Sequence, residues 1–271
     1  MIKVAGLLRE LQFSPNHELN DYLILTKTAE EIRKFGIEVN IYSEDDLFRG
    51  KISEDYIFSM IQSPAGVDYL LKIAPSKKMI INSPQSVFNC YRYNMLSLLN
   101  KGGIKVPQSL IVPSINSFAL PDGFFKGKLW IKRGDAHAAC KDDVVNTESE
   151  QEIGGILRQF KQRNIERCCV QEHIEGDTIK FYGVRDKNYF HWYYSENKYK
   201  KEFDINHLKD IVGKSAELLG LDIYGGDVII TPEGEIYVID MNDWPSFAPV
   251  RDEASKIIAE LIYDKIKQNK N

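Results

Sequence analysis

The sequence contains few cysteines, and no two of them are spaced as a metal-binding or redox pair. Its 271 residues include four cysteines, which are Cys90, Cys140, Cys168 and Cys169. None of them has the CxxC spacing that is typical of zinc sites and redox sites. The composition therefore predicts reduced thiols in a cytoplasmic protein.

Long apolar runs, internal repeats and low-complexity tracts are absent as well. No apolar run reaches the length that spans a membrane, and the N-terminal residues MIKVAGLLREL are too short and too charged for a signal peptide. The formal net charge is −4 and the isoelectric point is about 5.8, which argues against a broad nucleic-acid surface. With 43% hydrophobic and 27% charged residues, we expect a soluble globular protein without a membrane or nucleic-acid partner.

Charge is distributed unevenly along the chain. Residues 1–55 hold 7 Lys or Arg and 11 Asp or Glu, whereas residues 86–145 hold 8 Lys or Arg and only 4 Asp or Glu. A basic middle segment in an acidic protein suggests a local anionic ligand. Scattered surface lysines would explain the same counts, so the motifs must decide between the two interpretations.

The first third of the chain alternates between strand and helix patterns. The strands are expected at 2–8, 37–43, 56–63 and 78–84, and the helices at 21–36 and 65–74. Such alternation predicts a parallel sheet with helical crossovers. We therefore expect a Rossmann-like N-terminal domain over residues 1–84.

The rest of the chain mixes helices with hairpins. Helices are expected at 85–103, 148–164, 205–220 and 251–268. Short strands at 127–134 and 142–147 would enclose a loop, and three strand patterns at 168–174, 177–184 and 188–195 predict an antiparallel stretch. The turn sequence PEGE would join the last two strands, 224–231 and 235–241, into a hairpin.

This final hairpin carries a group of hard oxygen ligands. Asp227 lies on its first strand and Asp240 and Asn242 lie on its second, where positions two apart share a face. Folding the hairpin can therefore bring the three side chains together. Mg²⁺ prefers such a site, in which phosphates and waters complete a few protein oxygens. The pattern predicts a magnesium site, and a solvated strand end is the alternative.

Six segments, taken in order, resemble the ATP-grasp superfamily. They are NSP followed by a helix, LWIKRG, VQEHI, IKFYGV, YGGDVII and VIDMND. The likeness is nearest to the branches of the ribosomal protein S6 modification enzymes and the inositol-phosphate kinases, and it covers about residues 80–250. It implies an α/β fold in which an N-terminal parallel-sheet domain, 1–84, precedes two α+β subdomains, 85–173 and 174–271, that clasp ATP.

The resemblance also assigns residues to ATP. Lys132 matches a lysine that reaches the phosphates from the lid, and Arg92 falls where the superfamily usually has a second phosphate-binding lysine. The segment QEHI matches the hinge whose backbone binds the adenine edge, and residues 175–177 would lie beside the ribose. The complete set expected to bind nucleotide is Arg92, Lys132, Gln171, Glu172, His173, Ile174, Asp177 and Lys180.

In the same resemblance, Asp227, Asp240 and Asn242 match the metal ligands. Two Mg²⁺ ions would be held against the β- and γ-phosphates, and Mn²⁺ can replace them. Positioning and charge neutralisation would then carry the rate of phosphoryl transfer. The lid loop 134–141 contains no bulky apolar anchor, so we expect it to be mobile until a nucleotide binds.

The acceptor substrate leaves three interpretations open. Most of the superfamily resembles carboxylate–amine ligases, which form an acyl-phosphate on a small molecule or peptide. A small-molecule kinase of the inositol-phosphate type and a non-catalytic ATP-binding protein are the alternatives. Gly225 and the pair Pro245–Ser246 depart from ligase patterns, whereas the acidic segment 1–55 does not suit a polyphosphorylated kinase substrate.

Several residues near the expected site are candidates for acting on the acceptor. We expect catalytic roles for Lys180, Arg251 and His137. Additional substrate candidates are Trp244, Ser246, Arg185 and His191. The sequence does not distinguish a monomer from a homodimer.

Overall fold

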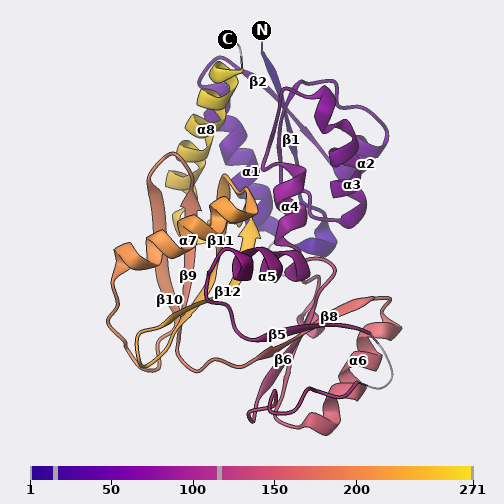
Figure 1. Ribbon diagram of the computed structural model, residues 1–271. Helices are drawn as coiled ribbons and strands as arrows, with labels where there is room; N and C mark the ends of the chain where they lie inside the picture. The colour runs from indigo at the N-terminus through magenta and orange to yellow at the C-terminus, as the bar shows by residue number, and fades with distance from the viewer. Residues whose placement is uncertain (1, 15–17, 115–117, 270–271) are drawn as a thin grey trace.

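The computed structural model describes residues 2–14, 18–114 and 118–269, and these residues form three four-stranded sheets. In Figure 1 the N-terminal sheet lies at the top right, the middle sheet at the bottom and the C-terminal sheet at the left. The first sheet is parallel and the other two are antiparallel. This is the α/β architecture that the sequence predicts.

The N-terminal sheet has the strand order β2-β1-β3-β4, as its alternating pattern predicts. Its strands are β1 (Lys3–Leu7), β2 (Glu38–Tyr42), β3 (Tyr56–Ser59) and β4 (Met79–Ile81). The connecting helices are α1 (Glu18–Arg33), α2 (Glu44–Phe48) and α3 (Pro64–Ile73), with the 3-10 helices η1 (Leu11–Phe13) and η2 (Ala74–Ser76). The sequence interpretation missed α2, which begins with a capping box between Ser43 and Asp46.

Two helices, and not the single helix expected at 85–103, lead out of the N-terminal sheet. They are α4 (Pro84–Cys90) and α5 (Arg92–Lys101), separated by Tyr91, whose backbone is extended with φ −60° and ψ 131°. Tyr91 is buried, and its hydroxyl donates a 3.0 Å hydrogen bond to the Gln62 carbonyl oxygen. This tertiary contact has no signature in the local helical pattern. The break places Arg92 at the start of α5.

The middle sheet has the order β5-β8-β6-β7 and carries one helix. Its elements are β5 (Ser109–Pro113), β6 (Leu129–Arg133), η3 (Lys141–Asp143), β7 (Val144–Thr147), η4 (Glu150–Glu152), α6 (Ile153–Gln162) and β8 (Arg167–Glu172). The helix α6 buries Ile153, Leu157 and Phe160, which are spaced to share one helical face. They join a hydrophobic core made only of residues from this part of the chain.

The C-terminal sheet has the order β10-β9-β11-β12. Its elements are β9 (Asp177–Val184), β10 (Tyr189–Glu196), α7 (Ile205–Leu219), β11 (Ile223–Ile230) and β12 (Ile236–Asp243). The hairpin of β11 and β12 is confirmed. The antiparallel stretch expected over 168–195 is wrong in one respect, because β9 and β10 pair while β8 belongs to the middle sheet. Residues 173–176 cross from one sheet to the other.

The last helix, α8 (Arg251–Gln268), follows η5 (Ala248–Val250) and returns to the N-terminal sheet. Figure 1 shows α8 beside α1 at the top of the molecule. Ile258 and Ile262 of α8 share one hydrophobic core with Ile24 of α1 and with Val184 and Ile223 of the C-terminal sheet. No helix among the described residues is long and apolar enough to cross a membrane.

Candidate active site

Two cavities meet above the C-terminal sheet. The middle cavity, of about 580 Å³, lies between the middle and C-terminal sheets. The junction cavity, of about 480 Å³, is lined by the C-terminal sheet, the N-terminal part and the loop 134–141. The residues that line both cavities are Arg92, Val144, Lys180, Asp227 and Asp240. Four of the five are charged, so the cavities meet at a cluster of charges.

The two carboxylates of this cluster lie opposite each other on the final hairpin. Asp227 of β11 pairs in register with Asp240 of β12, next to a β-bulge. Lys180 Nζ donates to Asp227 Oδ1 at 2.8 Å, and Arg92 donates from Nη1 to Asp240 Oδ1 at 3.3 Å. The Asn242 amide nitrogen lies 3.5 Å from the second Asp240 oxygen. The three expected metal ligands are therefore together, each within reach of its neighbour.

The environment shifts the pKa values of the two carboxylates in opposite directions. Burial raises the pKa of Asp227, and the nearby Lys180 offsets only part of that effect. Burial also opposes ionisation of Asp240, but Arg92 and Lys132 outweigh it and lower the pKa of Asp240. Two carboxylates thus face three cations at the meeting point of the cavities.

Lys132 is the most unusual of these cations. It projects from β6, is 8% exposed, and donates a 2.6 Å hydrogen bond from Nζ to Gln171 Oε1. Burial, together with the nearby Arg92, lowers the pKa of Lys132 from 10.5 to about 8. A charged ammonium held in this way is short of counter-charge, so an anionic ligand in the middle cavity would stabilise it.

The predicted hinge segment, residues 171–174, lines the middle cavity. Gln171, Glu172, His173 and Ile174 all contribute to its wall. The Glu172 amide is already bonded to the Gln108 carbonyl at 2.9 Å. His173 accepts a 3.1 Å hydrogen bond at Nδ1 from the Trp130 indole, which fixes its ring against the same wall. The segment thus combines backbone and aromatic surface, as a planar ligand would require.

Asp177 was expected beside the ribose, but it does not line either cavity. Its side chain is fully buried, and its two carboxylate oxygens accept the amides of Tyr199 at 2.7 Å and Lys201 at 2.8 Å. Both oxygens are therefore used to hold the loop after β10. Glu175, two positions earlier, does line the middle cavity, and it binds Lys198 at 2.5 Å.

Arg251 was expected to be catalytic, and the structure places it elsewhere. It begins α8 and donates from Nη2 to Asn20 Oδ1 at 2.5 Å, and it lines neither cavity. The preceding residues Ala248 and Pro249 still line the junction cavity, and Arg251 follows them at the start of α8. Two weaker candidates also lie outside both linings, since Arg185 pairs with Asp222 at 2.5 Å and His191 stacks beside Tyr182.

The segment after the metal ligands divides between core and cavity. Ser246, one of the substrate candidates, lines the junction cavity. Trp244 has 0% exposure and stacks on Phe58, so it is a core residue. It also has a positive φ of 38°, which turns the chain at the end of β12.

Several junction-cavity residues were not found from the sequence. Arg9, Asp21 and Gln62 come from the N-terminal part, and Tyr182 and Tyr193 come from β9 and β10. The guanidinium of Arg9 makes four hydrogen bonds, one to Asp21 and three to the carbonyl oxygens of residues 60, 243 and 244. The two tyrosine hydroxyls lie 3.3 Å apart. No local motif marks these residues, which lie far apart in the sequence.

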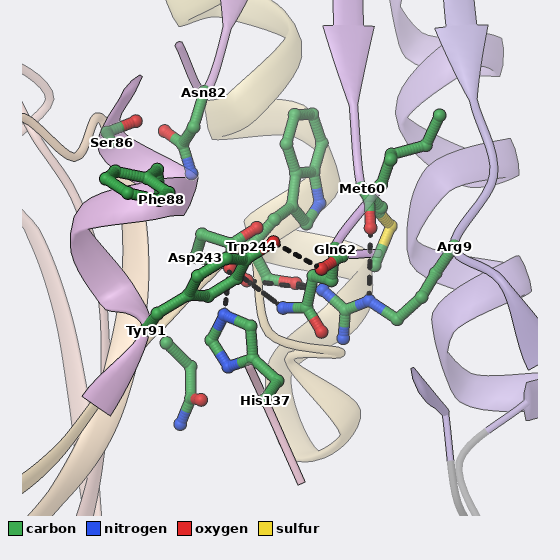
Figure 2. A network of polar contacts seen from close by, with 12 residues as sticks. Arg9, Met60, Gln62, Asn82, Ser86, Phe88, Tyr91, His137, Asp243 and Trp244 are labelled. Carbon is green, nitrogen blue, oxygen red and sulfur yellow. Dashed lines mark hydrogen bonds and ion pairs between the residues drawn. The ribbon is translucent and has the colours of Figure 1, made fainter. Parts of the chain in front are cut away.

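The loop 134–141 reaches the same cavity through His137. Its Nε2 lies 3.1 Å from Asp243 Oδ1, and Figure 2 shows this contact beside Gln62 and Tyr91. The contact is an ion pair when the imidazole is protonated, and Nε2 has no hydrogen bond of regular geometry. Burial opposes ionisation of Asp243, but His137 and Arg9 outweigh it and lower the pKa of Asp243.

The donor set at the hairpin fits a hard divalent cation. Asp227 and Asp240 offer carboxylate oxygens across one strand pair, and Asn242 offers an amide oxygen once its side-chain orientation is reversed. Among the described residues, no group of three or more His, Cys, Asp or Glu side chains forms a metal site by itself. A cation here would therefore need Asn242 and oxygens from a phosphate ligand to complete its coordination.

Solved structures of low sequence identity share this architecture. The D-alanine–D-alanine ligase of Coxiella burnetii is 13% identical with a TM-score of 0.74, covering 100% of this chain and 96% of that chain. The D-alanine–D-alanine ligase of Bacillus anthracis complexed with ATP is 13% identical with a TM-score of 0.72, covering 100% and 99%. The ATP-grasp ligase PsnB complexed with a minimal precursor is 15% identical with a TM-score of 0.65, covering 97% and 99%.

These likenesses establish the fold, and the chain has the ATP-grasp fold. No protein-family model matches the sequence, and no curated protein matches it. The fold-level similarity is thus to D-alanine–D-alanine ligases and to an ATP-grasp ligase complexed with a precursor.

Proposed function

We propose that the protein is a Mg-ATP-dependent ligase that activates a carboxylate as an acyl-phosphate and joins it to an amine. The observation that carries the proposal is the shared wall of the two cavities. Two carboxylates and the cations Arg92 and Lys180 line both cavities, and Lys132 lines the middle cavity. A nucleotide in the middle cavity would therefore present its terminal phosphate to a second substrate in the junction cavity.

Each group at the shared wall has a role in this reaction. Lys132, Arg92 and Lys180 would bind and orient the phosphates, and residues 171–174 would hold the adenine. Asp227, Asp240 and Asn242 would hold magnesium, which supplies charge neutralisation when it is bound. An oxygen of the acceptor carboxylate attacks the γ-phosphorus, the bond to the β–γ bridging oxygen breaks, and ADP leaves. The amine then attacks the acyl carbon, phosphate leaves, and the amine proton passes to solvent.

The junction cavity favours a ligase over a kinase of polyphosphorylated substrates. Arg9 is the cation on its N-terminal wall, and four protein groups already occupy its guanidinium. His137 is paired with Asp243. Arg92 and Lys180 lie at the shared wall, where the nucleotide phosphates would use them. The rest of the cavity therefore offers little free positive charge to a polyanion.

The remaining lining suits a small amino-acid-like acceptor. It contains aromatic and apolar surface together with neutral hydroxyl and amide groups. The apolar and aromatic contributors include Phe13, Tyr182, Tyr193, Pro245 and Pro249. The fold-level neighbours include D-alanine–D-alanine ligases and a ligase complexed with a precursor, which supports the same substrate class.

The test is a product screen by mass. The protein is incubated with Mg-ATP and with pairs of amino acids, short peptides and amines, and ADP release and product masses are recorded. A ligase gives ADP, phosphate and a product that equals both substrates less one water. A product that equals one substrate plus a phosphoryl group would establish a kinase instead. Absence of Mg-ATP binding in the folded protein would overturn the whole proposal, and Asp240→Asn serves as the inactive control.

A further inference from the structure

Asp243 is a buried carboxylate that the reaction above does not use. It directly follows the expected metal ligand Asn242 at the end of β12 and has 0% exposure. Because side chains alternate along a strand, Asp243 points away from the face that carries Asp240 and Asn242. It therefore lies beneath the site, and not among its metal ligands.

Partners from distant parts of the chain surround this carboxylate, as Figure 2 shows. Gln62 Nε2 donates a 2.8 Å hydrogen bond to Asp243 Oδ1, and His137 Nε2 lies 3.1 Å from the same oxygen. The other oxygen, Oδ2, is buried without a hydrogen-bond partner. Arg9 contacts the Asp243 carbonyl oxygen at 3.2 Å and so holds the backbone beneath the side chain.

His137 is the contribution of the lid loop to this group. Its side chain is 10% exposed, and its ring meets the Tyr91 ring edge-on with centroids 5.7 Å apart. Tyr91 in turn donates to the Gln62 carbonyl oxygen at 3.0 Å. The imidazole thus sits in a socket formed by the N-terminal part, the α4–α5 break and β12. His137 and Gln62 also line the junction cavity.

The physical consequence concerns the lid. An ionised carboxylate that is buried with one unpaired oxygen is costly unless a cation or donor lies beside it. Gln62 Nε2 donates to Asp243 Oδ1 at 2.8 Å, and the imidazole of His137, with Nε2 3.1 Å from the same oxygen, is the second polar group beside it. Withdrawing the lid loop would remove that group from Asp243. The carboxylate therefore favours the arrangement in which the loop covers the junction cavity.

We propose that Asp243 is a positioning residue. It binds His137 when the lid loop 134–141 closes, and this contact completes the wall of the junction cavity. This role rests on the proposed function only in what it positions. Asp243 does not line the middle cavity, and its side chain does not lie on the strand face that carries the expected metal ligands. Its effect should accordingly fall on the lid and the acceptor, and not on nucleotide affinity.

The first test measures hydrogen exchange in the loop 134–141 of the full-length protein without nucleotide. Asp243→Asn keeps the shape and the Gln62 contact, and His137→Gln removes the imidazole. Each should speed exchange of the Ala139 and Cys140 amides about tenfold, and the double variant should be no faster than either single variant. Asp222→Asn, a buried carboxylate paired with Arg185 away from both cavities, is the matched control and should leave the loop unchanged.

Additive effects of the two substitutions, or unchanged exchange in Asp243→Asn, would refute the proposed role of Asp243 in positioning His137. Melting temperatures of all variants show whether a change is local or global, and His137→Gln still tests the pairing if Asp243→Asn fails to fold.

A second arm measures binding of Mg²⁺ and the non-hydrolysable analogue AMP-PNP. Affinity should stay within about twofold of the unsubstituted protein in both single variants. Failure of the unsubstituted protein to bind AMP-PNP would count against the proposed function alone, because the first arm contains no nucleotide.

Discussion

Replacing Lys132 by Met should make the ligand-free protein more stable while removing its response to nucleotide. Lys132 is almost fully buried, and its pKa is lowered from 10.5 to about 8. The difference corresponds to roughly 3 kcal/mol, by which the folded state disfavours the charged lysine at pH 7. Met is similar in length and carries no charge, so the substitution removes this unfavourable term.

The gain is partly offset by the loss of one hydrogen bond. Lys132 Nζ donates to Gln171 Oε1 at 2.6 Å, and the substitution leaves that oxygen without its donor. An unsatisfied buried acceptor costs about 1–3 kcal/mol. We therefore expect Lys132→Met to raise the free energy of unfolding by about 1 kcal/mol at pH 7. In a chain of this size that change raises the melting temperature by about 2–4 °C.

The pH dependence gives the same prediction a sharper form. The folded protein binds the Lys132 proton less tightly than the unfolded chain, so between pH 8 and 10.5 the unfolded chain holds more protons. The stability contribution of Lys132 therefore becomes more favourable as pH rises through this window. The advantage of Lys132→Met should be largest below pH 8 and should shrink towards pH 10.5.

Urea unfolding at several pH values, with and without Mg-ATP, measures both effects. The unsubstituted protein should be stabilised by Mg-ATP through mass action, and Lys132→Met should lose most of that stabilisation. Lys128→Met, a less buried lysine of the same cavity, is the control for hydrophobic substitution. A Lys132→Met protein that is clearly less stable at pH 7, or that keeps the full response to Mg-ATP, would refute the reasoning.

Three further substitutions test the site. Asp240→Asn should lower kcat about a hundredfold or more while ATP still binds, because under the proposed function its carboxylate would act on the moving phosphoryl group through the metal; turnover assays and nucleotide titration check this. Arg251→Ala should change turnover by less than about twofold, since Arg251 lines neither cavity, and a larger loss would restore its expected catalytic role. Arg9→Lys should destabilise the protein by roughly 2 kcal/mol in urea unfolding, because Lys cannot reach all the carbonyl oxygens that Arg9 contacts; an unchanged midpoint would show those contacts to be dispensable.

Short-range patterns predicted much of this arrangement because strand geometry is local. The turn at 231–235 and the alternation of β12 were enough to bring Asp227, Asp240 and Asn242 together. The parallel N-terminal sheet followed from its alternating elements in the same way. Lys132 and the hinge segment 171–174 were placed by resemblance to a known fold, and both line the middle cavity.

The errors have a different physical origin, since each involves a tertiary contact. Tyr91 interrupts the expected helix because it is buried against Gln62, 29 positions away. Gln62 and Asp243 are 181 positions apart and form a hydrogen bond that no local sequence pattern predicts. The loop 134–141 was expected to be mobile because it has no bulky apolar anchor, and that expectation did not include two contacts, since Ala136 is buried and His137 reaches Asp243. These contacts depend on how the three sheets are assembled, and that assembly is not encoded in any short segment.

The distribution of hydrophobic cores indicates which part of the molecule can move. One core joins the N-terminal sheet and α8 to β9 and β11, so these elements should behave as a single body. The middle sheet has a core of its own, built from residues between 112 and 170, and of its buried apolar residues only Cys169 of β8 joins the core of the C-terminal sheet. A rigid-body motion is easiest between units that do not share a core. The middle sheet is thus the element that can open and close over the two cavities, and Asp243 lies on the body that it closes against. A middle sheet that ends its motion at a buried carboxylate next to the expected metal ligands would align the junction cavity and the proposed phosphate site in the same step.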